Sequence, residues 1–85
     1  MYKRDKWKIY LDILKVVSRN NVCSKTKVMH LSNLSWRTFT KHFEHLLKNN
    51  FLKKSGNAVK SYSLTERGVE LHSNLVRVEK MFTED

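Results

Sequence analysis

Four segments of the chain carry the polar and apolar pattern of an amphipathic helix. In each of them apolar residues recur at spacings of three and four, so that one side of a helix would be apolar. The segments are residues 5–19, 24–31, 36–48 and 65–82. The sequence therefore predicts three short helices in its first half and one longer helix at its end.

Between the third and the last helix the periodicity changes. Residues 51–54 and 59–64 bracket Gly56 and Asn57, and apolar residues alternate with serines in the second run. A Gly-Asn pair between short runs with β-branched and aromatic residues is typical of a two-residue hairpin. We expect a mostly helical α+β fold, in which one face of the second strand packs and the other is wet.

One face of each predicted helix is expected to supply the core. In the second helix Val28 and Leu31 lie three residues apart, and we expect them to face inward together. The third helix has a buried stripe by its i, i+4, i+7, i+8 spacing, namely Phe39, Phe43, Leu46 and Leu47. The apolar positions of the first helix are Ile9, Tyr10, Ile13, Leu14, Val16 and Val17.

Polar residues mark the ends of the helices. Ser24, Ser35 and Thr65 stand at the start of the second, third and last helices. Each is a candidate N-cap, because a side-chain hydroxyl can accept a free backbone N–H of the first turn. The asparagines at residues 20–21 are expected to end the first helix. A connection over residues 32–34 then joins two short helices, which is typical of a helix-turn-helix.

The last helix carries a heptad repeat. Its apolar or small positions are spaced 4, 3, 4, 3, 4, and they are Leu64, Gly68, Leu71, Leu75, Val78 and Phe82. A repeat of this kind predicts a coiled-coil seam. We interpret Leu71, Leu75, Val78 and Phe82 as a dimer interface, since the distal half of this helix would run past a small domain. The alternative is that the helix folds back onto the first helix.

The dimer interpretation divides the chain into two parts. Residues 1–64 would form a domain that carries the helix-turn-helix and the hairpin and binds the partner molecule, and residues 65–85 would form a coiled-coil dimerisation helix. A homodimer would also help a chain of 85 residues, which buries a comparatively small share of its surface by itself.

The charge of the chain is strongly positive and unevenly placed. There are 17 Lys and Arg against 8 Asp and Glu, a formal net charge of +9. Residues 1–64 hold 14 basic and 3 acidic residues, a net of +11, whereas residues 65–85 hold 3 and 5, a net of −2. Such an excess favours a polyanionic partner, most often nucleic acid, over a charge that serves solubility alone.

Several classes of protein are excluded by what the sequence lacks. No apolar run approaches the roughly 18 residues of a membrane span, and the charged start has no apolar stretch of the secretory kind. The single cysteine cannot form an internal disulfide or a multi-cysteine zinc site. We therefore expect an intracellular, cytoplasmic protein associated with the nucleoid, with no membrane partner.

The sequence also lacks the residue patterns that catalysis and cofactor binding usually require. The sequence contains two glycines and no phosphate-binding glycine loop, no nucleophile and base at a recognisable spacing, and no cluster of carboxylates. His42 and His45 lie three residues apart, but no further ligands complete a metal site. We expect no enzyme, no cofactor, no metal and no small-molecule substrate.

Most of the chain resembles a known family. The resemblance rests on residues 24–29, 34–36 and 43–52 and on the Tyr-x-Leu-Thr-x-x-Gly element at residues 62–68. These stretches resemble the archaeal winged helix-turn-helix family of small DNA-binding proteins and predicted transcriptional regulators. Some members dimerise through a C-terminal antiparallel coiled coil. Trp36 stands where Tyr is usual, and Asn50 where Gly is common.

The resemblance implies a winged helix-turn-helix that binds double-stranded DNA as a dimer. The third helix would enter the major groove, and the basic two-stranded wing would lie on the flanking backbone. Arg37 is the candidate for bidentate recognition of guanine. The implied DNA-binding residues are Lys25, Lys27, Ser35, Trp36, Arg37, Thr38, Thr40, Lys41, Lys53, Lys54 and Lys60. Thr40 is expected to reach a phosphate.

Other interpretations stay open beside the regulator. A winged helix can serve as a protein-interaction module in a transcription or replication assembly, in which case the basic face meets an acidic partner. It can also serve as a non-specific architectural protein of chromatin. For single residues, Trp36 could be a plug against the first helix, and Lys53 and Lys54 could protect an edge strand from pairing.

Overall fold

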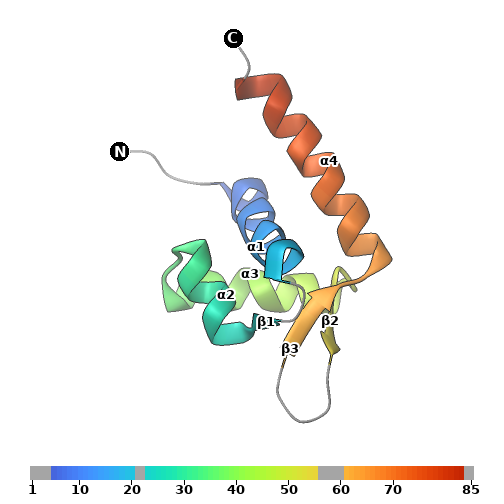
Figure 1. The fold of residues 1–85 in the computed structure, drawn as a ribbon. Helices are drawn as coiled ribbons and strands as arrows, with labels where there is room; N and C mark the ends of the chain where they lie inside the picture. The colour runs from blue at the N-terminus through green and yellow to red at the C-terminus, as the bar shows by residue number, and fades with distance from the viewer. Residues whose placement is uncertain (1–4, 21–22, 56–60, 84–85) are drawn as a thin grey trace.

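The computed structural model describes residues 5–20, 23–55 and 61–83 (Figure 1). Its elements follow the order α1–β1–α2–α3–β2–β3–α4. Their bounds are α1 Lys6–Asn20, β1 Cys23–Ser24, α2 Lys25–Ser32, α3 Trp36–Lys48, β2 Leu52–Ser55, β3 Ser61–Leu64 and α4 Glu66–Thr83. The predicted mostly helical winged helix-turn-helix fold is confirmed, and each predicted helix agrees with an observed one to within a residue at either end.

The three predicted N-caps are also confirmed. The Ser24 hydroxyl accepts the backbone N–H of Lys27 at 3.2 Å, and that of Ser35 accepts the N–H of Thr38 at 3.3 Å. The Thr65 hydroxyl accepts the N–H of Gly68 at 2.9 Å. Cap chemistry is local, so it acts wherever the backbone leaves a first-turn N–H unpaired.

The sheet has one strand more than the sequence predicts. Strands β2 and β3 pair antiparallel as the expected hairpin, with Leu52 opposite Leu64. The short strand β1 pairs with the other edge of β3, which gives the order β1-β3-β2. Two residues between helices carry no alternation that could reveal a strand. The expected turn at Gly56 and Asn57 lies outside the described residues.

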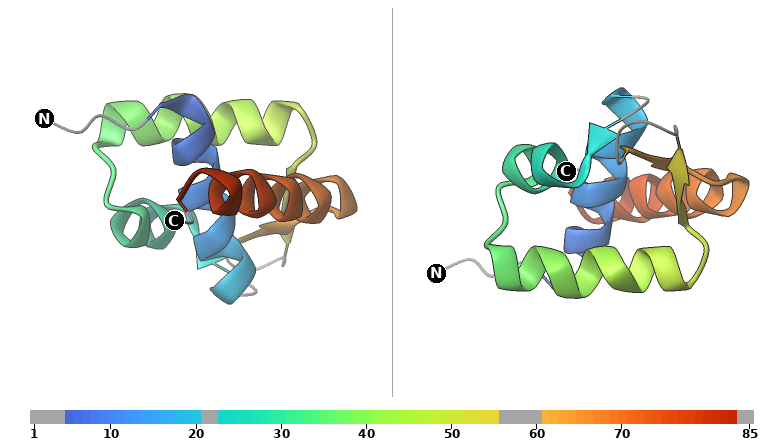
Figure 2. Two further views of the ribbon diagram at one scale, coloured as in Figure 1. Left: turned by 90° about the horizontal axis from the view of Figure 1, so that it is seen from above. Right: turned by 90° about the horizontal axis from the view of Figure 1, so that it is seen from below.

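The core lies where α1 passes between α3 on one side and α2 and the sheet on the other (Figure 2). The largest side chains that are fully enclosed come from these three helices: Phe39, Phe43, Ile13, Leu14, Leu46, Val17 and Val28. Phe43 stacks on Phe39 with 4.9 Å between ring centroids and meets the edge of Tyr62 at 4.9 Å. The stripe predicted for α3 is thus the centre of the core.

Two predictions about the core are wrong. Leu31 is 53% exposed, because α2 turns Val28 and Ser32 inward, an i, i+4 pair, in place of Val28 and Leu31. Ser61 is buried, although it was assigned to the wet face of its strand. It lies in the central strand, with Ser24 and Ser55 directly opposite on the two neighbouring strands, so that the backbone of the sheet flanks it on both sides.

The start of α4 is fixed by contacts with the connection between α3 and β2. The Thr65 N–H donates to the Phe51 carbonyl at 3.2 Å, and the Thr65 hydroxyl donates to the Asn50 carbonyl at 2.5 Å. Gly68 lies so close that a Cβ atom there would be 2.0 Å from the Phe51 carbonyl oxygen. This backbone approach needs a glycine, and it sets the direction in which α4 leaves the domain.

Helix α4 then runs along α1 and past it, away from the hairpin (Figure 1). Leu71 and Leu75 are half-buried and pack against the core, so the alternative of a helix folded onto α1 holds for this part of the heptad repeat. Val78 is 49% exposed and Phe82 is 85% exposed. The seam predicted for a dimer is therefore divided between internal packing and open surface.

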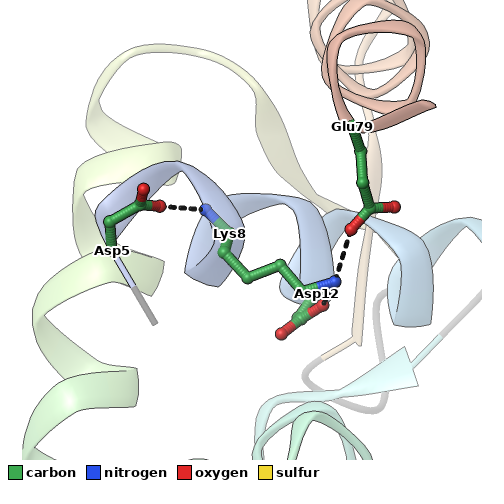
Figure 3. A network of polar contacts seen from close by, with 4 residues as sticks. All are labelled: Asp5, Lys8, Asp12 and Glu79. Atoms are coloured by element: carbon green, nitrogen blue, oxygen red, sulfur yellow. Dashed lines mark hydrogen bonds and ion pairs between the residues drawn. The ribbon is translucent and has the colours of Figure 1, made fainter. Parts of the chain in front are cut away.

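An ion pair joins the start of α1 to the last part of α4. The Lys8 ammonium lies 2.6 Å from a Glu79 carboxylate oxygen and 3.4 Å from Asp12 (Figure 3). The hydrogen bond from Lys8 holds the pKa of Glu79 below its usual value, and the same bond raises the pKa of Lys8. Both side chains are partly exposed, so the pair orients the two helices more than it stabilises them.

His72 lies seven residues before Glu79, on the same side of α4, and forms no ion pair with a described residue. The His72 Nε2 atom is buried and makes no hydrogen bond with any described residue. Burial lowers the pKa of His72, and the positive charges of Lys15 and Arg19 lower it further. At neutral pH both effects favour the neutral imidazole of His72 in the folded chain.

We predict that Gly68→Ala lowers the free energy of unfolding by about 1–3 kcal/mol, because the added methyl group would force the Phe51 carbonyl away from α4. Urea denaturation monitored by circular dichroism measures this. Ser73→Ala is the matched control, since Ser73 is an exposed residue of the same helix, and it should change stability by less than about 0.5 kcal/mol. Equal effects of the two substitutions would show that the close approach is not needed.

We also predict that acidification destabilises the fold through His72. The folded pKa lies below the unfolded one, so the unfolded chain takes up a proton first as the pH falls through about 6.5. Stability should drop between about pH 7.5 and about pH 5, and the drop should be smaller in His72→Gln, which cannot titrate. Urea midpoints at the two pH values test this, and the same drop in both proteins would contradict it.

Candidate nucleic-acid interface

The helix-turn-helix is held by local backbone contacts. Asn33 adopts the left-handed conformation with φ 56° and ends α2, and its N–H donates to the His30 carbonyl at 3.1 Å. The chain then turns, and Ser35 caps the first turn of α3. An asparagine tolerates the positive φ that this sharp turn requires. The turn places the N-terminus of α3 at the edge of the domain beside α2.

The side of α3 that faces away from the core carries three basic residues and one acidic residue. Its exposed residues are Trp36, Arg37, Lys41, Glu44, His45 and Lys48. Neither Arg37 nor Lys41 forms an ion pair with any residue that the structure describes. Their charges are therefore not neutralised within the described chain and are open to an anion in solution.

Trp36 and Lys25 form one unit at the start of the two helices. The Trp36 indole is 57% exposed and lies tilted against Phe39, with 6.4 Å between ring centroids. The Lys25 ammonium lies 5.7 Å from the Trp36 ring and 5.7 Å from Phe43. Trp36 is thus not a plug against α1, and Lys25 lies close to the apolar surface, where its charge interacts with two aromatic faces.

Three hydroxyl residues of α3 differ in what they can reach. Ser35 is exposed and Thr38 is half-buried, and the cap bond between them leaves the Ser35 O–H free to donate. Thr40 differs from the expectation. Its Oγ1 atom is buried and has no hydrogen-bond partner among the described residues, so it does not face a phosphate in this conformation.

The two lysines of strand β2 lie on opposite faces of the hairpin. Lys53 and Lys54 are both exposed and adjacent, and successive side chains of a strand leave it on opposite sides. Lys53 pairs with Ser63, and Lys54 with Tyr62. A single surface could therefore contact both lysines only along the free edge of β2, and not across one face of the hairpin. Lys60, the third basic residue expected on the hairpin, lies outside the described residues.

The histidines of α3 contact α1, which the sequence did not reveal. The Tyr10 hydroxyl and His45 Nδ1 are 2.7 Å apart, and the Tyr10 ring meets the edge of His42 at 5.4 Å. His42 Nδ1 also donates to the Thr38 carbonyl at 2.8 Å. Burial raises the pKa of Tyr10, so its hydroxyl remains protonated. Only the helical positions of the histidines, one residue before Phe43 and Leu46, hinted at this contact.

The elements of the predicted interface share one end of the molecule. Seen from below, α2, α3 and the hairpin lie toward the viewer and α4 lies behind them (Figure 2, right). The end of α4 and the hairpin point in opposite directions (Figure 1). Within the described residues, no helix combines the length and the apolar character that a membrane span requires. Nor do these residues contain a cluster of three metal-ligating side chains.

Comparison with known proteins supports the architecture. A family model described as "Winged helix-turn-helix" matches residues 3–83. Two relatives come from Methanocaldococcus jannaschii: the uncharacterized protein MJ0287 is 35% identical over 74 residues, and the uncharacterized protein MJ0290 is 40% identical over 80 residues. These matches span 87% and 94% of this chain, but 72% and 35% of the two relatives.

A solved structure shows the same fold at low sequence identity. The MarR family transcriptional regulator SPO1453 from Silicibacter pomeroyi superposes with a TM-score of 0.71 at 18% identity. The match covers 86% of this chain and 54% of that one. At this identity the likeness concerns the fold alone.

Proposed function

Because this chain belongs to the winged helix-turn-helix family, we propose that it binds double-stranded DNA as a homodimer and regulates transcription. Helix α3 enters the major groove, and the β2–β3 hairpin lies on the flanking backbone. The observation that carries this proposal is the capped, exposed α3, whose Arg37 and Lys41 form no ion pair with a described residue. The family assignment and the likeness to the structure of a transcriptional regulator also favour a non-enzymatic protein that acts at the nucleoid.

The contacts divide into those that read bases and those that hold the backbone. Arg37 is the best group for sequence readout, since a guanidinium can donate two hydrogen bonds to guanine O6 and N7. Trp36 presents an apolar face beside it, and Lys41 follows one turn later. Ser35, Thr38, Lys25 and Lys27, with the lysines of the hairpin, are assigned to phosphates or groove edges, which set register and affinity.

The dimer is proposed on the open part of α4. Val78 and Phe82 are too exposed for a helix that stays unpartnered, and they continue the heptad spacing of Leu71 and Leu75. A second copy would cover them and extend the packing that Leu71 and Leu75 begin within one chain. In this arrangement residues 1–64 contact DNA, and residues 65–85 hold two copies side by side.

We predict that Arg37→Ala weakens binding to a selected DNA site by about 1–3 kcal/mol and relaxes sequence preference, if it reads a base. The Lys53→Ala/Lys54→Ala protein should weaken binding to all sequences alike, because phosphates carry no sequence. Lys80→Ala is the control, since Lys80 is exposed on α4, far from the hairpin, and should change nothing. Gel-shift titrations on selected and random duplexes measure all three.

Salt dependence tests the electrostatic part of the same proposal. If the dimer neutralises six to ten phosphates, affinity should fall about 10³–10⁵-fold between about 50 and 200 mM salt. A protein that ignores duplexes at low salt, or binds them without salt dependence, would contradict the proposal and favour a protein-interaction module. Equal affinity for all sequences, unaffected by Arg37→Ala, would instead favour an architectural protein of chromatin.

We predict that Phe82→Glu and Val78→Glu each convert the protein to monomers, because a carboxylate would be buried in the apolar contact. Sedimentation equilibrium should give twice 10.2 kDa for the original protein and 10.2 kDa for the variants. Val69→Glu is the matched control: Val69 is 55% exposed on α4 but lies off the heptad positions, so that variant should remain a dimer. An original protein that is monomeric at roughly 100 µM would refute this interface.

A further inference from the structure

Trp36 is an exposed aromatic residue at the end of α3 that would lead into DNA. It follows the cap Ser35 directly and is 57% exposed. Among the described residues of α3 it is the only large apolar side chain that is exposed. The N-terminal residues of a recognition helix contact base edges in the major groove. The indole is therefore placed where sequence is read, and its chemistry decides what it recognises.

The indole is supported from the protein side. Its ring lies tilted against Phe39, which is fully buried, with 6.4 Å between centroids. The Lys25 ammonium of α2 lies 5.7 Å from the Trp36 ring and attracts it electrostatically. A ring that is already held loses little conformational freedom on binding. Trp36 Nε1 forms no hydrogen bond with a described residue, so its N–H is available to an acceptor on another molecule.

The four bases differ in how well their major-groove edges match an indole. An indole offers an apolar ring and one donor, and it has no acceptor. Thymine presents the acceptor O4 beside its C5 methyl group, the one methyl group that the groove displays. Guanine presents two acceptors without a methyl group, whereas adenine and cytosine each present a donor that an indole cannot accept. Thymine is therefore the base whose edge matches both parts of Trp36.

We propose that Trp36 recognises thymine through its C5 methyl group. This inference rests on the proposed function, because it requires that α3 enters the major groove. The methyl group packs against the indole ring and is removed from water, and the Nε1 N–H adds a preference for the acceptor beside it. Trp36 and Arg37 are adjacent in the first turn of α3. The thymine should therefore lie close to the guanine that is assigned to Arg37.

The test removes the methyl group alone. Deoxyuridine replaces each thymidine of a selected duplex in turn, and the affinity of the protein for each duplex is measured by fluorescence anisotropy. At a thymine close to the guanine whose recognition is lost in Arg37→Ala, uracil should weaken binding about fourfold, which corresponds to about 0.8 kcal/mol for one buried methyl group. Uracil keeps O4, so the loss reports the methyl contact.

Variants decide whether Trp36 makes this contact. Trp36→Ala should bind the thymine and uracil duplexes equally, whereas Trp36→Phe, which keeps an apolar ring, should retain the preference for thymine. Lys27→Ala is the matched control, because Lys27 is exposed on α2 and is assigned to a phosphate. That variant should bind both duplexes more weakly and keep the fourfold difference between them. Circular dichroism checks that each variant is folded.

Two results would overturn this inference and leave the proposed function in place. One is a selected duplex in which no thymine methyl group affects binding. The other is a methyl effect that persists unchanged in Trp36→Ala, since another residue would then make the contact. A protein that binds no duplex at low salt would instead refute the proposed function and this inference together.

Discussion

The packing of Phe43 fixes how α3 and the hairpin lie relative to each other. Its ring is fully buried, stacks on Phe39 of the same helix and meets Tyr62 of the central strand edge-on. Aromatic pairs of this geometry add to the burial of their area and are sensitive to small displacements. A DNA-binding surface made of α3 and the hairpin requires that both keep one orientation. That orientation is therefore set inside the core and not by the surface residues themselves.

A second constraint governs α4. The approach of Gly68 to the Phe51 carbonyl aims the helix along α1, so that Leu71 and Leu75 become internal while Val78 and Phe82 pass beyond the domain. One heptad repeat is thereby divided into a part that packs within the chain and a part that is exposed, because a helix of 18 residues is longer than the surface against which it packs. Folding onto α1 accounts for the first part, and the proposed dimer contact would use only the second.

The sequence predicted whatever depends on local chemistry. Helix bounds follow from periodicity, and the caps at Ser24, Ser35 and Thr65 follow from hydroxyls at first turns, so both could be read without a fold. What failed depends on distant partners. Strand β1 forms by pairing with the edge of β3, which is distant in sequence. The rotation of α2 turns Ser32 toward the core and leaves Leu31 exposed. The Thr40 hydroxyl oxygen is buried by residues that are not its sequence neighbours.

The use of acidic residues explains why the basic surface stays available. Lys8 is paired with Asp12 and Glu79, and this pairing serves the contact between α1 and α4. Around α3 the structure relies on buried aromatic rings and on neutral caps, which do not consume positive charge. The folding contacts around α3 thus do not use its exposed cations. Salt should screen the exposed cations of α3 strongly, while it affects the apolar core beneath them little, because only the former depends on long-range charge.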